Sequence, residues 1–369
     1  MTVVTELDII GYMNNDQLTN FDKRIQNLPQ GIVLQVAKID QLQGQWLAGA
    51  KLNPQVLGRL KKSVLITSTG ASTRIEGSSL SDADVERLMQ GLKTQKMLDR
   101  DTQEVRGYYE LLEFIFESYE NISVSENTIK QLHSELLKYS LKDRKHKGQY
   151  KQLENRVDAT DTEGGVVGVI FETTPMFLVP KEMRELFIWA TSALRTGSHH
   201  PLLIISCFVV DFLKIHPFLD GNGRLSRIVT NLLLLQNGYE YMPYVSHEKL
   251  VEEGKSEYHI ALRRSQGTFG SKDESINDWT RFFLGVVESQ TRQALRSLSN
   301  ESVDKLLSPN QLKVWGYINS TDSEITIKDI LDGTEVARPT IRQAIDRLLK
   351  LNRIERIGQG RTTRYRKIK

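Results

Sequence analysis

Apolar residues recur at helical spacing along most of the chain. Pro54 opens one such stretch, which stops at Gly77, and a proline near the start with a glycine after the end is typical of a helix. Ser81, with Asp84 three residues later, indicates the start of another helix. Similar patterns predict further helices, over residues 102–119, 126–139, 181–195, 201–214, 224–236 and 275–297. A mainly α-helical protein is therefore expected.

Residues 156–179 depart from this pattern. Valine, isoleucine and phenylalanine cluster at 166–171, after Glu163-Gly164-Gly165, and β-branched residues beside a Gly-Gly turn predict a hairpin. Pro175 and Pro180 end the segment. Because a lone hairpin buries little surface by itself, we expect a flap rather than part of a core.

The C-terminal part has its own pattern. Residues 298–308 are rich in serine and are expected to form a linker. Beyond them, three short helices and two strands follow in the order of a winged helix-turn-helix. The helices are expected at 309–319, 326–332 and 338–351, and the strands at Ile354–Ile357 and Thr363–Ile368, with Gly358-Gln359-Gly360 as the turn. The predicted organisation is a helical N-terminal region at 1–110, a core at 111–297, the linker at 298–308 and the winged helix-turn-helix at 309–369.

Positive charge is concentrated near the end of the chain. The sequence carries a net charge of +3, but residues 338–369 hold eleven Lys/Arg and two Asp/Glu, so they carry +9 and the remainder −6. A basic block on a mildly acidic body predicts binding to a polyanion. The alternatives are a solvated basic tail and a module that binds protein. We expect DNA contacts from the recognition helix and the wing, through Arg338, Arg342, Arg347, Arg361 and Arg364.

Composition narrows the class of protein. Hydrophobic residues make up 39% and charged residues 26%, which argues against a largely disordered or fibrous chain. The only cysteine, Cys207, excludes a disulfide framework and suits a reducing compartment. The apolar runs near 201–210 and 228–235 are too short to span a bilayer, and the first residues lack the pattern of a signal peptide. A cytoplasmic protein without a membrane segment is expected.

The most informative segment is residues 216–227, with the sequence HPFLDGNGRLSR. Pro217 breaks the preceding apolar helix. Gly221 and Gly223 allow a tight loop that can approach a ligand closely, and a new helix is expected to begin around Arg224. Backbone N–H groups and the positive end of a helix dipole then converge at one place, which predicts an anion site.

Charged residues in the same segment suit chemistry at phosphate groups. Arg224 and Arg227 are three residues apart, so they share a helix face and can clamp adjacent phosphates. Asp220 can hold Mg²⁺, and His216 can act as a general base near neutral pH. The segment matches neither the GxxxxGK[ST] loop nor GxGxxG. Each residue alone also suits a turn or a solvated helix face, but the combination predicts phosphoryl or nucleotidyl transfer.

Residues 216–227 resemble the signature of the Fic family, HPFx[D/E]GNGRxxR, at every position. Residues 129–137 resemble the family helix that precedes the flap, and Gly148-Gln149-Tyr150-Lys151 resembles its Gly-x-Tyr-Arg sequence, with Lys for Arg. The resemblance extends over residues 20–290. It implies an all-helical Fic catalytic core with a β-hairpin flap, which would add a strand to an extended target segment.

The resemblance also implies an activity, namely a Mg²⁺-dependent protein adenylyltransferase that transfers AMP from ATP to Ser, Thr or Tyr hydroxyls of proteins, including itself. His216 would be the catalytic base, and Asp220 would bind Mg²⁺ between the α- and β-phosphates. Arg224 and Arg227 would hold the β- and γ-phosphates. The nucleotide-binding residues implied are Glu76, Gly221, Asn222, Gly223, Arg224, Leu225, Ser226, Arg227 and Tyr258.

The adenine side departs from the family pattern. Many relatives carry an Asn and a Tyr-Tyr pair there, whereas this chain has Gly254 for the Asn and His259 for the second Tyr. Tyr258 is still expected to cover the base. Transfer of phosphate or of another nucleotide is therefore kept as an alternative.

Residues 72–77 resemble the inhibitory motif of the family, [S/T]xxxE[G/N], with Ser72, Glu76 and Gly77 at the defined positions. The resemblance implies autoinhibition, in which Glu76 reaches Arg227 and takes the place of the γ-phosphate. In some inhibited relatives the same Glu positions a water that removes AMP, so AMP removal is a second implied activity. The alternative is a glutamate at a helix end before a glycine.

A second class of function also fits the sequence. It is a DNA-binding transcriptional regulator in which the Fic core serves as a nucleotide-dependent switch. The resemblance further implies a homodimer, because relatives dimerise.

Overall fold

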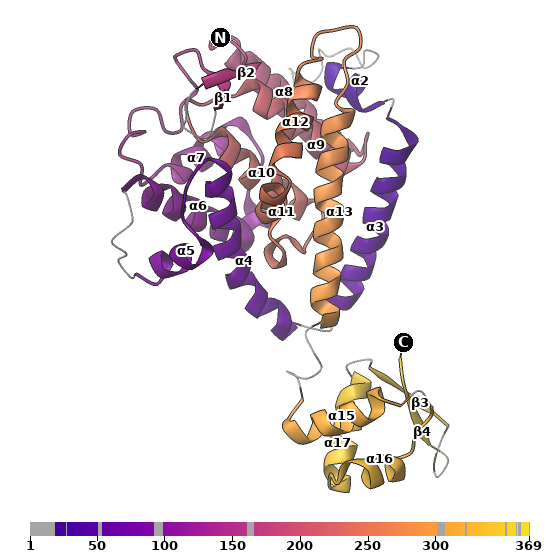
Figure 1. Ribbon diagram of the computed structural model, residues 1–369. Helices are drawn as coiled ribbons and strands as arrows, with labels where there is room; N and C mark the ends of the chain where they lie inside the picture. The colour runs from indigo at the N-terminus through magenta and orange to yellow at the C-terminus, as the bar shows by residue number, and fades with distance from the viewer. Residues whose placement is uncertain are drawn as a thin grey trace, which may run out of the picture. The chain divides into compact units, whose positions relative to one another are not determined.

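The computed structural model divides the chain into two compact units: residues 1–47 with 57–294, and residues 48–56 with 295–369. Most of the described residues are helical, and two antiparallel strand pairs complete the structure (Figure 1). The expectation of a mainly α protein with a β-hairpin is confirmed. The described residues are 19–26, 28–50, 54–91, 99–160, 166–300, 307–321, 323–350, 353–358, 360 and 363–368.

The α-helices between residues 20 and 300 follow the predicted order, with four that the pattern did not predict. The unpredicted ones are α2 (Asn20–Gln26), α3 (Gln30–Ala50), α11 (His247–Glu253) and α12 (Lys255–Gln266). The others are α4 (Pro54–Ile75), α5 (Asp82–Met89), α6 (Asp99–Ser118), α7 (Glu126–Leu136), α8 (Val179–Thr196), α9 (Pro201–Ile215), α10 (Asn222–Gln236) and α13 (Asn277–Asn300).

Several expected helix ends differ from the structure, and three of them adjoin the candidate site or the expected linker. Helix α10 begins at Asn222 rather than around Arg224, because Gly221 has a φ of 82° and acts as the N-cap. Helix α7 ends at Leu136, three residues early. Helix α13 continues to Asn300, so the first part of the expected linker is helical, whereas residues 301–306 lie outside the described residues.

Helix α9 is the centre of the larger unit. Nearly all of its side chains from Leu202 to Ile215 are buried, and a helix that is apolar on all sides must be surrounded by other elements. It packs against α2, α8, α10 and α12, while α10 also contacts α6, α7 and α11 (Figure 1). Cys207 is fully buried in α9, and burial raises the pKa of its thiol well above the usual value. The turn between α9 and α10 is therefore fixed by two buried helices.

The predicted hairpin is present as β1 (Arg156–Thr160) and β2 (Val166–Glu172). The strands pair antiparallel, with Arg156 opposite Glu172, and the register shifts between residues 157 and 158 and between 159 and 160. Such irregularities bend a strand pair and increase its twist. The expected Gly-Gly turn lies outside the described residues.

The smaller unit contains three helices and two strands in the predicted order. The core is apolar and includes Val314 of the first helix, Ile330 of the second and Ile341 of the third. Ser308 and Thr326 form capping boxes at the starts of the first two helices. The elements are α15 (Pro309–Asn319), α16 (Ile327–Thr334), α17 (Arg338–Lys350), β3 (Ile354–Ile357) and β4 (Arg364–Lys367).

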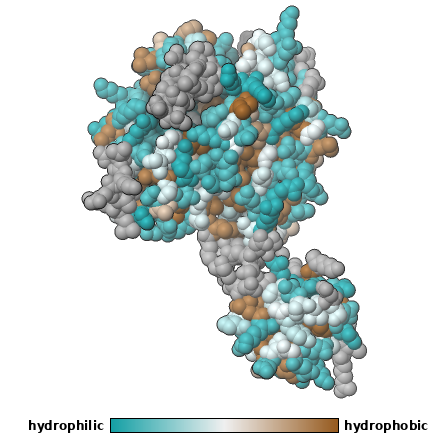
Figure 2. Space-filling model, in the orientation of Figure 1, coloured by the Kyte–Doolittle hydropathy of each residue, from teal (hydrophilic) through white to brown (hydrophobic). Residues whose placement is uncertain are grey.

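The surface is mainly polar. Figure 2 shows hydrophilic residues over most of the visible face of the larger unit, with hydrophobic residues scattered among them. In the described part of the chain, no helix is both long enough and apolar enough to cross a membrane.

Candidate active site

His216 occupies the turn directly after α9. Its φ of 51° is in the left-handed region, which ends the helix, and its N–H still donates to the carbonyl oxygen of Phe212. Its Nδ1 lies 3.3 Å from the carbonyl oxygen of Leu213. Because a carbonyl only accepts, Nδ1 carries the hydrogen and Nε2 carries the lone pair. Burial lowers the pKa of His216 to about 4, so the imidazole is neutral at pH 7.

A second histidine, His133 of α7, is hydrogen-bonded to the turn between α9 and α10. The N–H of Gly148 donates to its Nδ1 at 2.8 Å, and its Nε2 donates to the carbonyl oxygen of Asp220 at 3.0 Å. The ring stacks on Phe218 at a centroid distance of 3.8 Å. Burial lowers the pKa of His133 to about 4, which keeps it neutral in this bridging role.

The anion site predicted from the sequence corresponds to the first turn of α10. The side chain of Asn222 closes the preceding loop, since its amide donates to the carbonyl oxygen of Phe218 at 2.7 Å and its oxygen accepts from the N–H of Phe218 at 3.0 Å. No described residue accepts a hydrogen bond from the N–H groups of residues 222–224. Unpaired N–H groups at a helix start, together with the helix dipole, attract an anion.

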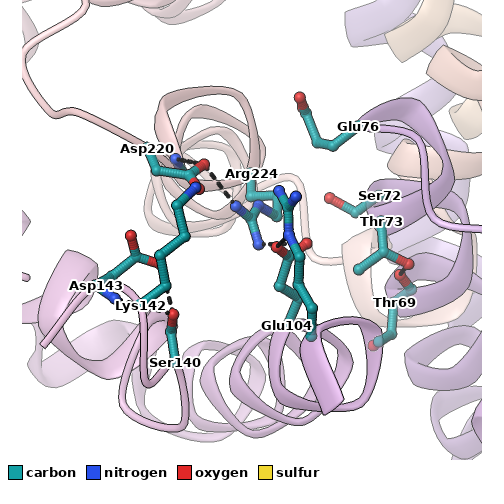
Figure 3. A network of polar contacts seen from close by, with 12 residues as sticks. Thr69, Ser72, Thr73, Glu76, Glu104, Ser140, Lys142, Asp143, Asp220 and Arg224 are labelled. Atoms are coloured by element: carbon teal, nitrogen blue, oxygen red, sulfur yellow. Dashed lines mark hydrogen bonds and ion pairs between the residues drawn. The ribbon is translucent and has the colours of Figure 1, made fainter. Parts of the chain in front are cut away.

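Arg224 is buried between two carboxylates. Its guanidinium contacts Asp220 and Glu104 at 2.9 Å each, and the residue is 2% exposed (Figure 3). Burial raises the pKa of Asp220, but Arg224 and the N–H of Gly221 lower it by more, so the carboxylate is ionised. Lys142 points to the other oxygen of Asp220 at 3.8 Å.

Arg227 is held by the end of α4. Its Nε donates to the hydroxyl of Ser72 at 2.8 Å, and its Nη2 donates to the Ser72 carbonyl oxygen at 3.0 Å and to Glu76 Oε1 at 2.7 Å. Arg227 is buried, whereas the side chain of Glu76 is 37% exposed. Burial raises the pKa of Glu76 and the charge of Arg227 lowers it by more, so the pair is ionic. Neither Arg224 nor Arg227 lies on a solvated helix face.

Glu76 is also the helix end that the alternative reading expected. Helix α4 ends at Ile75, Gly77 has a φ of 100°, and the N–H of Ser78 donates to the carbonyl oxygen of Thr73. Both descriptions therefore hold: the residue terminates α4 and its carboxylate reaches Arg227.

Three polar residues beneath Arg227 were not identified from the sequence. Glu248 of α11 is fully buried and accepts hydrogen bonds from Tyr108 at 2.8 Å and from Asn231 at 2.7 Å. Asn231 in turn donates to the carbonyl oxygen of Arg227 at 2.9 Å. Nothing in the sequence signals this network, because its members are brought together only by the packing of α6, α10 and α11.

Tyr258 lies behind Arg227 rather than at an open surface. It is 6% exposed and lines a recess together with Arg227 and Ser226. Its ring meets Trp279 and Phe282 edge-on, each at 5.7 Å. Gly254 separates α11 from α12, and the ring of His259 lies beside that of Tyr258.

Two residues of the implied nucleotide set face inward. Leu225 is fully buried in the core, and the hydroxyl of Ser226 donates to the carbonyl oxygen of Gly223 at 2.8 Å. The N–H of Leu225 donates to the carbonyl oxygen of Gly221 at 2.8 Å, so it does not add to the N–H groups of residues 222–224.

In the smaller unit, Arg338, Arg342 and Arg347 are exposed on α17, and Arg364 is exposed at the start of β4. None of the three α17 arginines forms an ion pair with a described residue. Arg361 lies outside the described residues.

The site contains one candidate magnesium ligand. Among the described residues, no cluster of three or more His, Cys, Asp or Glu could hold a metal ion. A single ionised carboxylate at the mouth of an anion site fits Mg²⁺, which keeps several waters and is usually bound through one or two carboxylates and substrate phosphates. Asp220 meets that requirement.

The part of the chain that contains the site is similar to known proteins. Residues 123–234 match the model of the Fic/DOC family. The chain is 31% identical over 86 residues to a probable protein adenylyltransferase of Aquifex aeolicus, which covers 23% of this chain and 26% of that protein. It is 28% identical over 106 residues to the protein adenylyltransferase Fic of Drosophila grimshawi. This match covers 29% of this chain and 19% of that protein. The matches thus span about a quarter or less of these two relatives.

The similarity to solved structures covers more of the chain than the sequence matches do. A Fic family protein from Desulfovibrio desulfuricans G20 aligns with a TM-score of 0.59 and 24% identity, covering 97% of this chain and 98% of that one. A Fic domain containing signaling protein from Bacteroides thetaiotaomicron VPI-5482 aligns with a TM-score of 0.58 and 22% identity. The alignment covers 72% of this chain and 98% of that one. These similarities establish the fold alone.

Proposed function

We propose that this protein is a Mg²⁺-dependent protein adenylyltransferase that is autoinhibited by Glu76. The observation that supports the proposal is the turn between α9 and α10, which begins at neutral His216 and leads into the predicted anion site at residues 222–224. Two buried arginines border the same site. The adenylyltransferases among the relatives support AMP as the transferred group.

His216 is the general base in the proposed reaction, and the target hydroxyl is the group that receives AMP. Nε2 of His216 takes the proton of a Ser, Thr or Tyr hydroxyl, and the hydroxyl oxygen forms a bond to the α-phosphorus of ATP. The bond between the α-phosphorus and the bridging oxygen breaks, and pyrophosphate leaves. A general base with this geometry typically contributes about 10²–10⁴-fold to the rate.

The first turn of α10 supplies the electrostatic part. Its N–H groups and Arg224 are fixed in place before reaction, so they stabilise the negative charge that develops on the phosphate oxygens without reorganisation. Asp220 would hold Mg²⁺, which neutralises phosphate charge when bound. Arg227 would hold the γ-phosphate once its ion pair with Glu76 opens.

Autoinhibition follows from competition for one guanidinium. Glu76 and a phosphate oxygen are both anions, and Nη2 of Arg227 already donates to Glu76. ATP bound with Glu76 in place is displaced from the aligned position, and a 1 Å displacement costs on the order of 100-fold in rate. The same carboxylate, when not displaced, is placed to orient a water for AMP removal, which we include as a second activity.

Incorporation of labelled ATP tests this function. The Glu76→Gly variant is expected to modify itself about 10- to 100-fold faster than the unchanged protein. The Glu76→Gly/His216→Ala variant should incorporate no label yet bind ATP in calorimetry, because His216 lies outside the anion site. Absence of incorporation by Glu76→Gly despite ATP binding would overturn the proposal.

DNA binding by the smaller unit is a second candidate function. The observation that favours it is the set of exposed arginines on α17, which has no ion-pair partner among the described residues. A helix with such a face after two shorter helices has the arrangement of a helix-turn-helix that contacts phosphates. In this reading the Fic/DOC domain serves as a nucleotide-dependent switch.

A further inference from the structure

Lys151 is buried where the hairpin joins the turn that carries His216. The residue is 3% exposed, and its Nζ donates to Asn155 Oδ1 at 2.6 Å and to the hydroxyl of Thr173 at 2.8 Å. A third donor hydrogen faces the carbonyl oxygen of Ile215 at 3.4 Å. An ammonium has three donor hydrogens, and three acceptors surround this one.

The partners of Lys151 mark the two ends of the hairpin. Asn155 directly precedes β1 and Thr173 directly follows β2. The hydroxyl of Thr173 also lies 2.6 Å from the carbonyl oxygen of Asn155, next to the pair formed by Arg156 and Glu172. One buried side chain thus holds the base of the hairpin closed.

The same residues are bonded to the turn after α9. The N–H of Lys151 donates to the carbonyl oxygen of Pro217 at 2.8 Å. The side-chain amide of Asn155 donates to the carbonyl oxygen of Phe218 at 3.0 Å. On the other side, the N–H of Thr174 donates to the carbonyl oxygen of Lys214. The base of the hairpin is therefore bonded to the chain on both sides of His216.

We propose that Lys151 is a positioning residue that fixes the hairpin relative to His216. The inference rests on the transfer reaction proposed above, in which His216 takes the proton of the target hydroxyl. It also uses the expectation from the family resemblance that the hairpin holds the target segment. A target aligned on the hairpin is then also aligned with the base, and such alignment lowers the entropic part of the barrier.

The charges around Lys151 make this role sensitive to pH. Burial lowers the pKa of Lys151 to about 8, with Lys214 lowering it and Glu154 and Glu182 raising it. Loss of one proton leaves two donor hydrogens for three acceptors. The link between hairpin and turn should weaken as the pH rises through this value.

Hydrogen exchange of the full chain tests the link without reference to activity. In Lys151→Met, amides of the hairpin should exchange at least about tenfold faster, while amides of α9 and α10 stay unchanged, because the lost bonds lie at the hairpin base. Lys181→Met is the matched control, since Lys181 is 70% exposed and pairs with Glu185. Unchanged hairpin exchange in Lys151→Met overturns the proposal, as does equal acceleration in both variants.

Kinetics in the Glu76→Gly background test the consequence for catalysis. Lys151→Met should lower kcat about tenfold or more and leave the KM for ATP within twofold. In the parent protein, deprotonation of Lys151 should lower the rate above pH 8. Lys151→Arg should keep most of the activity and should not show this fall in rate. Equal kcat in Lys151→Met and its parent contradicts the proposal. If no variant transfers AMP, the proposed function fails and the exchange experiment alone decides the role of Lys151.

A second variant covers the case in which Lys151→Met does not fold. Thr173→Val keeps the ammonium and the shape of the side chain but removes one partner. It is expected to accelerate hairpin exchange in the same residues, and unchanged exchange in this variant overturns the proposal equally.

Discussion

The carboxylate of Glu76 lies directly against Gly223, so that a Cβ atom at position 223 would overlap its Oε1. The same oxygen accepts the hydrogen bond from Arg227 at 2.7 Å. One side chain from the end of α4 therefore covers the first turn of α10, where the N–H groups of the anion site are. Glycine at 223 is therefore needed for this contact with Glu76, and in the proposed function it would also allow the approach of a phosphate.

Removing Arg227 should not reproduce the effect of removing Glu76. Arg227→Ala loses the cation together with its competitor, so AMP incorporation should stay at or below that of the unchanged protein. In the Glu76→Gly background, the same change should weaken ATP binding by about tenfold or more, since a charge-assisted hydrogen bond is lost. Calorimetry and labelled ATP measure the two effects. Incorporation by Arg227→Ala at the Glu76→Gly rate would contradict the competition.

Arg74 should control how firmly Glu76 is held. Its guanidinium contacts Glu252 at 2.6 Å and Asp82 at 2.9 Å, and donates to the carbonyl oxygen of Leu80, which ties the end of α4 to α11 and α5. Arg74→Ala should raise AMP incorporation, but by less than Glu76→Gly, because the carboxylate remains.

Lys249→Ala provides the control for Arg74. Lys249 pairs with the same Glu252 at 2.9 Å, and its side chain forms no hydrogen bond or ion pair with the described residues of α4. Lys249→Ala should leave AMP incorporation unchanged. If Lys249→Ala and Arg74→Ala have the same effect, the restraint on α4 is not the cause.

His133 should make the stability of the larger unit depend on pH. Its pKa is about 4 in the folded chain and about 6.5 when unfolded, so the unfolded state binds more protons below pH 6.5. Stability from this group is complete above pH 6.5 and falls as the pH drops towards 4, by about 2 kcal/mol between pH 7 and 5. Urea unfolding of His133→Asn should show a pH dependence smaller by this amount. Identical dependence in both proteins would exclude the bridging role of a neutral ring.

The exposed face of α17 should set the salt dependence of any DNA affinity. Arg342→Gln/Arg347→Gln should lower the slope of log K against log salt by about 1.8, at 0.9 per neutralised phosphate. Lys313→Gln, on the exposed face of α15, is the control that should leave the slope unchanged. Fluorescence anisotropy with duplex DNA measures both. A slope that does not differ between the variants, or absence of binding at low salt, rejects DNA as the partner.

The parts of the site that depend on local sequence could be predicted. The segment 216–227 encodes a helix end, a glycine-rich turn and a helix start within twelve residues, so its geometry follows from nearby residues. Residues 72–77 indicated both the helix end and the carboxylate. The structure brings Glu76 and Arg227 together across 151 residues of chain, which only the family resemblance implied.

The parts that depend on tertiary packing could not be predicted. Glu104 and Glu248 are carboxylates within helices, where a solvated position is the usual one, and their partners come from other helices. Lys151 lies in a short loop, and its partners are 4, 22 and 64 residues away. The start of α10 was misplaced for a different, local reason: glycine and asparagine are weak helix formers, and the bonds of Asn222 to Phe218 compensate for this.

The single thiol of the chain has a practical consequence. Cys207 is enclosed in α9 and its pKa is raised, so thiol-directed reagents should reach it only when the larger unit opens. A cysteine introduced at the exposed Phe177, which follows the hairpin, could then carry a fluorophore with the native cysteine left in place. The rate at which Cys207 itself reacts would report the global opening of the same molecules, so one preparation would time both local movement at the hairpin and unfolding of the helical core.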